Sequence, residues 1–246
     1  MVVAHRGASA VEAENTLPAF ESAVGAGADA VEFDVRVTAD GVPVVMHDPD
    51  VMRTTNGAGL VRDMTLAEIK CLEIRTASGG STEVPTLLEA LACLSGRVGA
   101  DIEIKNIPGE PDFEPDRERV VEAVLEAVRG SDDEVLLSSF NPFSLSKAHE
   151  LATGVITGLL TGPGVDARAT LEFAHEKGDT WVLPFSEDLW DAGESFIEEA
   201  HEVGLLIGTW IVDDPDRAAA FMLRGIDAVA TNDPARIVAA RGSALG

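Results

Sequence analysis

The chain alternates between short apolar runs of strand length and longer segments with helical periodicity, and this alternation occurs eight times in 246 residues. The strand-like runs are Val2–His5, Asp29–Val37, Val98–Lys105, Glu134–Ser139, Val155–Leu160, Trp181–Pro184, Leu205–Val212 and Ala228–Thr231. The helical segments are Thr16–Ala26, Leu87–Ser95, Pro115–Arg129, Pro142–Leu151, Val165–Lys177, Asp191–Val203, Pro215–Arg224 and Pro234–Arg241. Because repeated strand-then-helix units build a parallel sheet, the pattern predicts a (β/α)8 TIM barrel in which residues 1–246 form a single domain. An open doubly wound sheet is the alternative, but no glycine-rich dinucleotide fingerprint supports it.

One strand-like run, Val42–His47, has no helix before it and follows the second strand after a turn containing Asp40 and Gly41. Asp-Gly between two apolar runs is a strong hairpin signal. The second strand therefore continues outward, turns, and returns over legs of about six residues, or roughly 20 Å. Legs of equal length would return His47 to the level of Asp34.

The segment from about residue 49 to residue 86 is too long for an ordinary connection between a strand and a helix. It contains a turn-rich part and a short helical pattern, Leu66–Leu72, with Thr65 as its N-cap and Glu68 at the capping-box position. We predict a small inserted subdomain here, after the second strand and above the C-terminal face of the barrel.

The formal net charge of −25 limits the partners of the chain. Nucleic acid is not expected, because its binding needs a basic surface, and an anionic membrane would repel the chain. No apolar run reaches the roughly 20 residues of a membrane helix, and MVVAHRG lacks a charged signal-peptide leader. We therefore expect a soluble, cytoplasmic protein with no stable membrane anchor. Cys71 and Cys93 are expected to be small hydrophobic residues on helices in a reducing compartment.

Charged residues stand at alternate positions of two predicted strands, as Glu32 and Asp34 in one and Asp101, Glu103 and Lys105 in the other. Both faces of a strand in a parallel barrel are covered, so these charges are costly unless they converge on a cation, a ligand or one another. The all-oxygen set of Glu32, Asp34 and Glu103 favours one divalent cation, Mg²⁺ or Ca²⁺ with Mn²⁺ as a further option, because zinc usually recruits histidine or cysteine. Asp101 lies deeper in its strand, where an internal hydrogen bond is expected.

Two histidines come to the same end of the predicted barrel. His5 and Arg6 end the first strand, and the hairpin returns His47. The histidines would be free for acid–base chemistry, since an unperturbed imidazole titrates at about pH 6.5. Arg6 and Lys105 add positive charge. Carboxylates, a cation, two histidines and two positive side chains suit an anionic substrate, most naturally a phosphate ester.

Specific motifs contain these residues, namely HRG, AENTLPAF, VEFDVRVTADGVPVVMHD, RTTNGAG followed by DMTLAEIK, PTLLEAL and IEIK. Weaker motifs continue to the end of the chain, namely SSFNP, GTWIVDD and GIDAVATNDP. Together they resemble the glycerophosphodiester phosphodiesterase family. One departure is ATNDP, where an acidic residue often directly follows the threonine, and it leaves the contribution of the eighth strand open.

The resemblance implies a TIM barrel with an inserted subdomain, a divalent cation, and hydrolysis of small-molecule glycerophosphodiesters to sn-glycerol 3-phosphate and an alcohol. It implies that His5 and His47 form the acid–base pair, that the three carboxylates bind the cation, and that Arg6 and Lys105 contact phosphate. Which histidine is the base stays open, as does the choice between water and the glycerol 2-hydroxyl as nucleophile.

Further residues are candidates for substrate contact. Asn15 follows the first strand, Phe140 follows the fourth, and Trp210 ends the seventh. Arg36 would either touch substrate or pair with a neighbouring acid, and Asp48 would either orient His47 or cap its loop.

Two other functions are compatible with the sequence. Action on lipid phosphodiesters, as by a lysophospholipase D or a phosphoinositide-cleaving phospholipase, would favour an apolar rim or an amphipathic surface helix, which the insertion does not clearly supply. A non-catalytic phosphate- or sugar-binding barrel would lack a histidine or a cation ligand, whereas all these positions are filled here.

Overall fold

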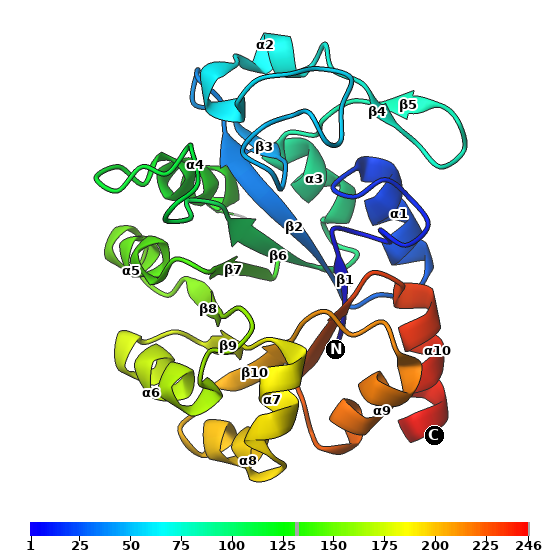
Figure 1. The fold of residues 1–246 in the computed structure, drawn as a ribbon, viewed down its shortest axis with the longest axis vertical. Coiled ribbons are helices and arrows are strands. Elements are labelled where there is room, and N and C mark those ends of the chain that lie inside the picture. The colour runs from blue at the N-terminus through cyan, green and yellow to red at the C-terminus, as the bar shows by residue number, and fades with distance from the viewer. Residues whose placement is uncertain (131–132, 246) are drawn as a thin grey trace.

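A computed structural model describes residues 1–130 and 133–245 of the chain, so residues 131, 132 and 246 of the predicted single domain lie outside the described ranges. Within these ranges eight parallel strands form a closed barrel, in the order β1-β11-β10-β9-β8-β7-β6-β2, with β1 and β2 paired to complete it (Figure 1). The strands are β1 (Val2–His5), β2 (Ala30–Val37), β6 (Gly99–Ile104), β7 (Val135–Ser139), β8 (Ile156–Leu160), β9 (Trp181–Leu183), β10 (Leu206–Thr209) and β11 (Ala228–Thr231). The predicted TIM barrel is confirmed.

Helices surround the barrel on its outside (Figure 1). They are α1 (Leu17–Gly25), α3 (Leu87–Leu94), α4 (Arg119–Val128), α5 (Pro142–Leu151), α6 (Ala167–Lys177), α7 (Ser186–Ala192), α8 (Ser195–Glu202), α9 (Pro215–Leu223) and α10 (Pro234–Leu245). The helix predicted over Asp191–Val203 is present in part as α8, but the prediction missed α7. Two helices, α7 and α8, meet there because Gly193 adopts a positive φ of 91° at the end of α7. Helix α4 also begins later than the predicted Pro115.

The alternation along the strands separates apolar from charged side chains. On β2, Val31, Phe33 and Val35 are fully buried in the core between the barrel and the helices. The ring centroids of Phe33 and Phe20 of α1 lie 5.3 Å apart. Burying each such side chain contributes about 1.5–3 kcal/mol. Since successive side chains point to opposite faces of a strand, this packing directs Glu32 and the other even-numbered residues of β2 into the barrel.

The predicted hairpin is present, with β3 (Pro43–Val45) antiparallel to β2. Val35 pairs with Val45, and the Met46 amide donates a hydrogen bond of 2.9 Å to the carbonyl of Asp34. The return leg therefore brings His47 back beside Asp34, as the equal lengths of the legs predicted.

The segment after the hairpin contains η1 (Val61–Asp63), α2 (Leu66–Ile69), β4 (Ile74–Arg75) and β5 (Ser81–Thr82). It has a small core of its own with the hairpin, which includes Val44, Met46, Val61 and Ile69. The capping box of Thr65 and Glu68 is present. Figure 1 shows the segment at one edge of the molecule, next to β3.

Two other findings bear on the sequence predictions. Cys71 is exposed and follows the end of α2, so its prediction as a small hydrophobic residue on a helix is wrong, while Cys93 is half-buried on α3. In the described part of the chain, no helix combines the length and apolar character needed to span a membrane.

Candidate active site

Three carboxylates meet inside the barrel at the carboxyl ends of β2 and β6. The strand register places Asp34 directly opposite Glu103, and Glu32 opposite Asp101. One oxygen from each of Glu32, Asp34 and Glu103 lies within 4.8 Å of the others. Their exposed fractions are 6%, 0% and 6%. Asp101 lies one layer deeper and accepts a hydrogen bond of 2.6 Å from Ser138 Oγ, as its position predicted.

Burial and mutual repulsion make this carboxylate cluster costly on its own. Burial, together with Asp34 and Glu103, raises the pKa of Glu32 well above its usual value. Burial raises the pKa of Glu103 as well. Glu32 Oε1 is buried without a hydrogen-bond partner among the described residues. A divalent cation would neutralise this repulsion and occupy the open carboxylate oxygen, so the donor set fits a hard cation.

Lys105 and Arg6 supply positive charge to the same cluster. Lys105 Nζ lies 3.2 Å from Asp34 Oδ1 and 2.7 Å from Glu103 Oε1. Arg6 Nε lies 3.2 Å from Asp34 Oδ2, and the Arg6 amide donates to Glu32 Oε2 over 2.9 Å. Burial alone would raise the pKa of Asp34, but Lys105 and Arg6 outweigh it and hold that pKa far below its usual value. Both positive side chains, Lys105 and Arg6, border the same cavity as the carboxylates.

Asn15 supports Asp34 from the loop after β1. Its Nδ2 donates a hydrogen bond of 2.7 Å to Asp34 Oδ2, and its Oδ1 accepts one of 3.3 Å from the Asp34 amide. The side chain is buried, and it is not among the described residues that line the cavity. The structure thus gives Asn15 a supporting position, and its contact with substrate stays a prediction.

A chain of hydrogen bonds fixes the tautomer of His5. Asp213 can only accept, and it receives a hydrogen bond of 2.7 Å from Asn232 Nδ2. Asn232 therefore presents its Oδ1 to His5 Nδ1 at 2.8 Å, so Nδ1 carries the proton and the Nε2 lone pair is free. Burial and the neighbouring Arg6 lower the pKa of His5, which favours the neutral ring.

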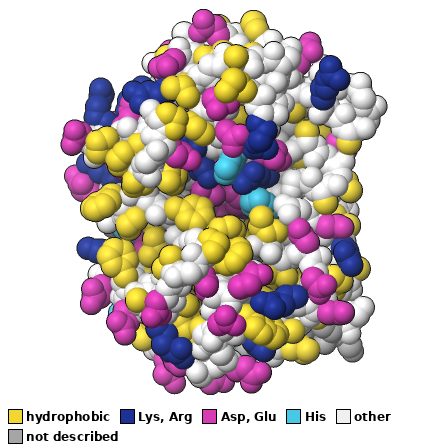
Figure 2. All heavy atoms as spheres, viewed as in Figure 1, with side chains coloured by type: hydrophobic (Ala, Val, Ile, Leu, Met, Phe, Trp, Pro, Cys, Tyr) yellow, Lys and Arg dark blue, Asp and Glu magenta, His cyan; other side chains and the backbone are white. Residues whose placement is uncertain are grey.

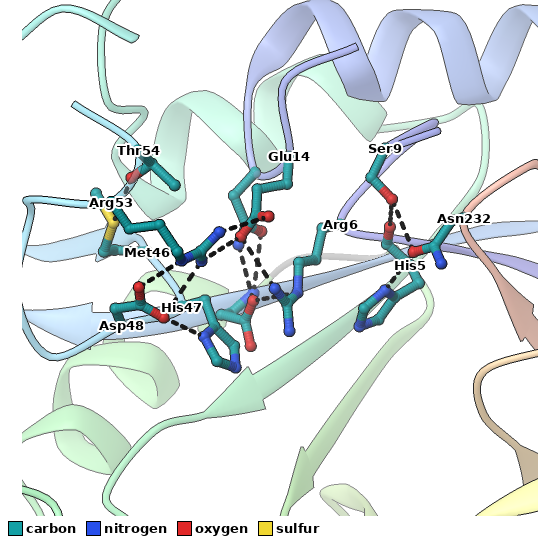
Figure 3. Close-up of polar contacts among 12 residues, drawn as sticks. His5, Arg6, Ser9, Glu14, Met46, His47, Asp48, Arg53, Thr54 and Asn232 are labelled. Atoms are coloured by element: carbon teal, nitrogen blue, oxygen red, sulfur yellow. Dashed lines mark hydrogen bonds and ion pairs between the residues drawn. The ribbon is translucent and has the colours of Figure 1, made fainter. Parts of the chain in front are cut away.

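His47 has a carboxylate as its partner instead of an amide. Its Nδ1 lies 2.6 Å from Asp48 Oδ1, so the structure favours the predicted orienting role of Asp48. Arg53 Nε donates to Asp48 Oδ2 over 2.5 Å, and Arg53 also binds Glu14, which in turn accepts from Arg6. Figure 3 shows this chain of contacts running from His47 to Arg6. Burial lowers the pKa of His47, while Asp34 and Asp48 act in the opposite direction.

Arg36 holds the backbone of His47. Its side chain is only 1% exposed, and Nε donates a hydrogen bond of 2.8 Å to the carbonyl of His47. Nη1 pairs with Asp112 at 2.6 Å and Nη2 with Glu110 at 2.7 Å. The predicted pairing of Arg36 with neighbouring acids is present, and its contact with substrate stays a prediction.

Aromatic side chains form the other side of the mouth. The rings of Phe140 and Trp210 meet edge to face at 5.3 Å, and Phe185 packs on Trp210 at 5.5 Å. Lys105 Nζ lies 6.0 Å from the centre of the Phe140 ring. Figure 2 shows histidine and acidic groups in a central hollow, with hydrophobic side chains along its margin. Phe140 and Trp210 both line this cavity, which has a volume of about 420 Å³.

The sequence predictions missed the residues that orient His5, although they named Asp48 as a candidate for orienting His47. Asn232 and Asp213 belong to the motifs ATNDP and GTWIVDD, so the signal was present, but His5 and Asn232 are 227 positions apart. The barrel closure between β11, β1 and β2 brings these residues together.

Comparisons with known proteins agree with this geometry. The sequence model of the glycerophosphoryl diester phosphodiesterase family matches residues 5–236. A glycerophosphodiester phosphodiesterase of Caldanaerobacter subterraneus subsp. tengcongensis is 33% identical over 243 residues, which cover 97% of this chain and 96% of the relative. One of Bacillus subtilis is 30% identical over 250 residues, covering 95% of this chain and 84% of the relative.

Solved structures show the same fold. An Oleispira antarctica phosphodiesterase, solved in complex with the product sn-glycerol-3-phosphate, superposes with a TM-score of 0.86 at 28% identity, covering 98% of this chain and 96% of that one. A glycerophosphodiester phosphodiesterase of Thermotoga maritima superposes with a TM-score of 0.79 at 27% identity, covering 97% and 96%.

Proposed function

Because this chain belongs to the glycerophosphoryl diester phosphodiesterase family, we propose that it hydrolyses glycerophosphodiesters to sn-glycerol 3-phosphate and an alcohol. Its strongest support is the convergence of two oriented histidines and two positive side chains on one buried carboxylate cluster. The product in the related Oleispira antarctica structure is the product expected of this reaction.

One divalent cation bound by Glu32, Asp34 and Glu103 is part of the proposal. Mg²⁺ and Ca²⁺ are the first candidates, with Mn²⁺ as the third, because all the donors are carboxylate oxygens. When bound, the cation would act as a Lewis acid toward a phosphoryl oxygen. It would also hold these carboxylates in their ionised form.

Arg6 and Lys105 bind the phosphate in this proposal. Both side chains border the cavity, next to the carboxylates that they now pair with. The guanidinium of Arg6 offers several donors for phosphate oxygens, while Lys105 acts as a point charge. Together they neutralise the negative charge that develops on phosphorus oxygens during displacement.

The different partners of the histidines suggest their roles. His5 is the general base in the proposal, because burial and Arg6 lower its pKa and the hydrogen bond from Nδ1 to Asn232 leaves Nε2 as the unprotonated nitrogen of the neutral ring. His47 is the general acid, because the carboxylates of Asp34 and Asp48 favour its protonated form and oppose the lowering of its pKa by burial, whereas the partner of His5 is a neutral amide. His5 takes a proton from the nucleophile as the new P–O bond forms, and His47 gives a proton to the departing alkoxide as the old one breaks.

An activity screen tests the proposal. Purified protein is incubated with glycerophosphocholine or glycerophosphoethanolamine and Mg²⁺, Ca²⁺, Mn²⁺ or EDTA, and sn-glycerol 3-phosphate is measured with a coupled enzyme. Release is expected with a divalent cation and is expected to stop with EDTA. No release from any diester with any cation would refute the activity, and full release in EDTA would refute the cation.

The identity of the nucleophile has a separate test. If the glycerol 2-hydroxyl attacks, a cyclic glycerophosphate forms first, and phosphorus NMR during early turnover detects it. If water attacks the diester directly, no cyclic species appears at any time during turnover, whereas oxygen-18 from solvent enters glycerol 3-phosphate by either route because water also opens the cyclic phosphate.

A further inference from the structure

The barrel interior below the carboxylate cluster is hollow. TIM barrels are ordinarily filled by layers of large branched side chains that point inward. Here several inward positions carry only glycine or alanine, and the strand register brings them together. Ala30 on β2 lies opposite Gly99 on β6, and Gly208 on β10 lies opposite Ala228 on β11. All four line the cavity of about 420 Å³ described above, although the Leu183 side chain takes up the space directly beside Gly208.

This cavity, here called the lumen, continues from the mouth to the opposite end of the barrel. Its lining includes Glu103 and Lys105 at the mouth and Gly99 and Ile156 at the other end. Gly99 and Glu103 are four residues apart on β6, which corresponds to about 13 Å along the strand. The lumen volume falls in the range of about 300–1,000 Å³ typical of small-molecule sites.

The wall formed by β7 to β11 is apolar. Trp181 and Leu183 from β9 pack there with Val3 and Ala228, and Leu136, Leu160 and Leu206 join this cluster at its edge. On the opposite wall, β2 and β6 contribute the inward carboxylates Glu32, Asp101 and Glu103 above the small residues Ala30 and Gly99. An elongated ligand in the lumen therefore meets hydrocarbon along one side and the carboxylate cluster at its upper end.

An unfilled apolar cavity forfeits van der Waals contacts, which a hydrocarbon chain would restore. The mouth of this lumen is the proposed phosphate site, so a chain attached to the phosphodiester would start at the upper end. Water forms no hydrogen bonds with an apolar wall, so it is a poorer occupant of the lumen than a hydrocarbon chain. These features identify one chemical class of occupant, an unbranched alkyl chain covalently attached to the substrate phosphate.

We infer that the lumen is a binding site for the alkyl chain of the substrate, so that the enzyme prefers glycerophosphodiesters whose second group is a linear aliphatic chain. This inference rests on the proposed phosphodiesterase activity. It assigns a function to Trp181, Leu183 and the small residues of β2, β6, β10 and β11, none of which contributes to the chemistry at phosphorus.

A chain-length series tests the preference. The substrates are the ethyl, butyl, hexyl and octyl diesters of glycerol 3-phosphate, with glycerophosphocholine as the hydrophilic reference. Burying one methylene contributes about 0.8 kcal/mol, so KM is expected to fall by up to about fourfold for each added CH₂ until the lumen is full. Equal KM values for the ethyl and octyl diesters, with normal hydrolysis of glycerophosphocholine, would overturn the inference and leave the proposed function intact.

Variants distinguish the lumen from the aromatic rim. Ala228→Leu fills the lower lumen and is expected to lower the octyl-to-ethyl ratio of kcat/KM, whereas Ala239→Leu, at an exposed position on α10, is expected to keep that ratio. Phe143 is exposed at the start of α5. If Phe143→Ala removes the chain-length effect and Ala228→Leu does not, the chain lies on the surface and the inference is wrong.

A binding assay tests the site without turnover. Octanol carrying bromine at its far end is titrated into the protein, and quenching of tryptophan fluorescence is measured. Quenching is expected to be retained in Trp190→Phe, whose indole lies against Arg224, and to fall in Trp181→Phe. Quenching without hydrolysis of any diester would refute the proposed function but not the lumen site, and no saturable quenching would refute the site.

Discussion

The two sides of the barrel interior differ in the charge and the size of their inward side chains. On β1, β2 and β6 the inward residues include His5, Glu32, Asp34 and Glu103, and buried charge dominates. On β7 to β11 the inward side chains are small or apolar, with Trp181 and its neighbours forming a hydrocarbon wall. The strands on both sides share one parallel ladder and comparable packing against helices.

The contrast shows that the fold and the chemistry use opposite faces of the same strands. Outward residues such as Phe33 on β2 and Val182 on β9 pack against the surrounding helices in both halves. Inward residues do not pack against the helices. The strands β1, β2 and β6 can therefore carry buried charges there, and the strands β7 to β11 can carry small side chains that leave the lumen open. The charges are tolerated because cations, amides and hydroxyls surround them.

The largest effect is expected from neutralising the charged side. Asp34→Asn should lower kcat/KM for glycerophosphocholine by about 10³-fold or more, because a Lewis-acid cation contributes several kcal/mol. Calorimetric titration with Mg²⁺ and Ca²⁺ should show loss of tight binding. Asp101→Asn is the matched control on the neighbouring strand and should cost far less, since Ser138 binds Asp101 below the cluster. Equal losses in both variants would contradict the assignment of the cation ligands.

The second-largest effect is the loss of kcat in variants of the two active-site histidines, compared with a histidine elsewhere in the molecule. His5→Ala and His47→Ala should each lower kcat by about 10²–10⁴-fold, the usual contribution of general acid–base catalysis. His175→Ala, on the exposed side of α6, should retain wild-type kcat. Near-normal turnover in either active-site variant would eliminate that histidine from the mechanism.

A pair of leucines tests the difference in packing between the two faces. Leu137 is fully buried in the core behind β7, whereas Leu183 borders the lumen. Leu137→Ala should lower the free energy of unfolding by about 2–5 kcal/mol, and Leu183→Ala by an amount near the lower end of that range, because the Leu183 side chain packs beside Gly158 and Gly208 but borders the lumen on its other side. Urea denaturation followed by circular dichroism measures both. A larger loss for Leu183→Ala would show that the lumen wall is tightly packed.

The smallest effect concerns the partner of His47. Hydrogen bonds from Arg53 and His47 lower the pKa of Asp48 to about 2 despite its partial burial, so it is ionised at neutral pH. Asp48→Asn keeps the acceptor but removes the negative charge that favours the protonated imidazole, so the pKa of His47 should fall. His47 then loses its proton at a lower pH, so the alkaline limb of the kcat profile should shift to lower pH by about one unit.

Asp50→Asn is the control for this shift, since Asp50 accepts a hydrogen bond from the Met52 amide and should leave the profile unchanged. If the acidic limb moves to lower pH in Asp48→Asn while the alkaline limb stays in place, His47 is the base and the roles proposed for the histidines are reversed.

Much of the fold and part of the site could be predicted from local pattern. The period of two in VEFDV placed Glu32 and Asp34 on the covered inner face, and Asp40-Gly41 predicted the hairpin that returns His47. The break between α7 and α8 was missed, because Gly193 lies in a segment whose apolar periodicity continues on both sides. The exposure of Cys71 was missed because α2 ends before it.

The sequence by itself determined the eightfold alternation, the face of each charged residue and the residue types of the chemistry, because these depend on the periodicity of neighbouring residues. The tertiary structure alone decided which of them meet. Pairing of β1 with both β2 and β11 brings His5 to Glu32 on one side and to Asn232 on the other. The lumen is likewise a tertiary result, since a glycine or alanine leaves space only where the register sets another small residue opposite it.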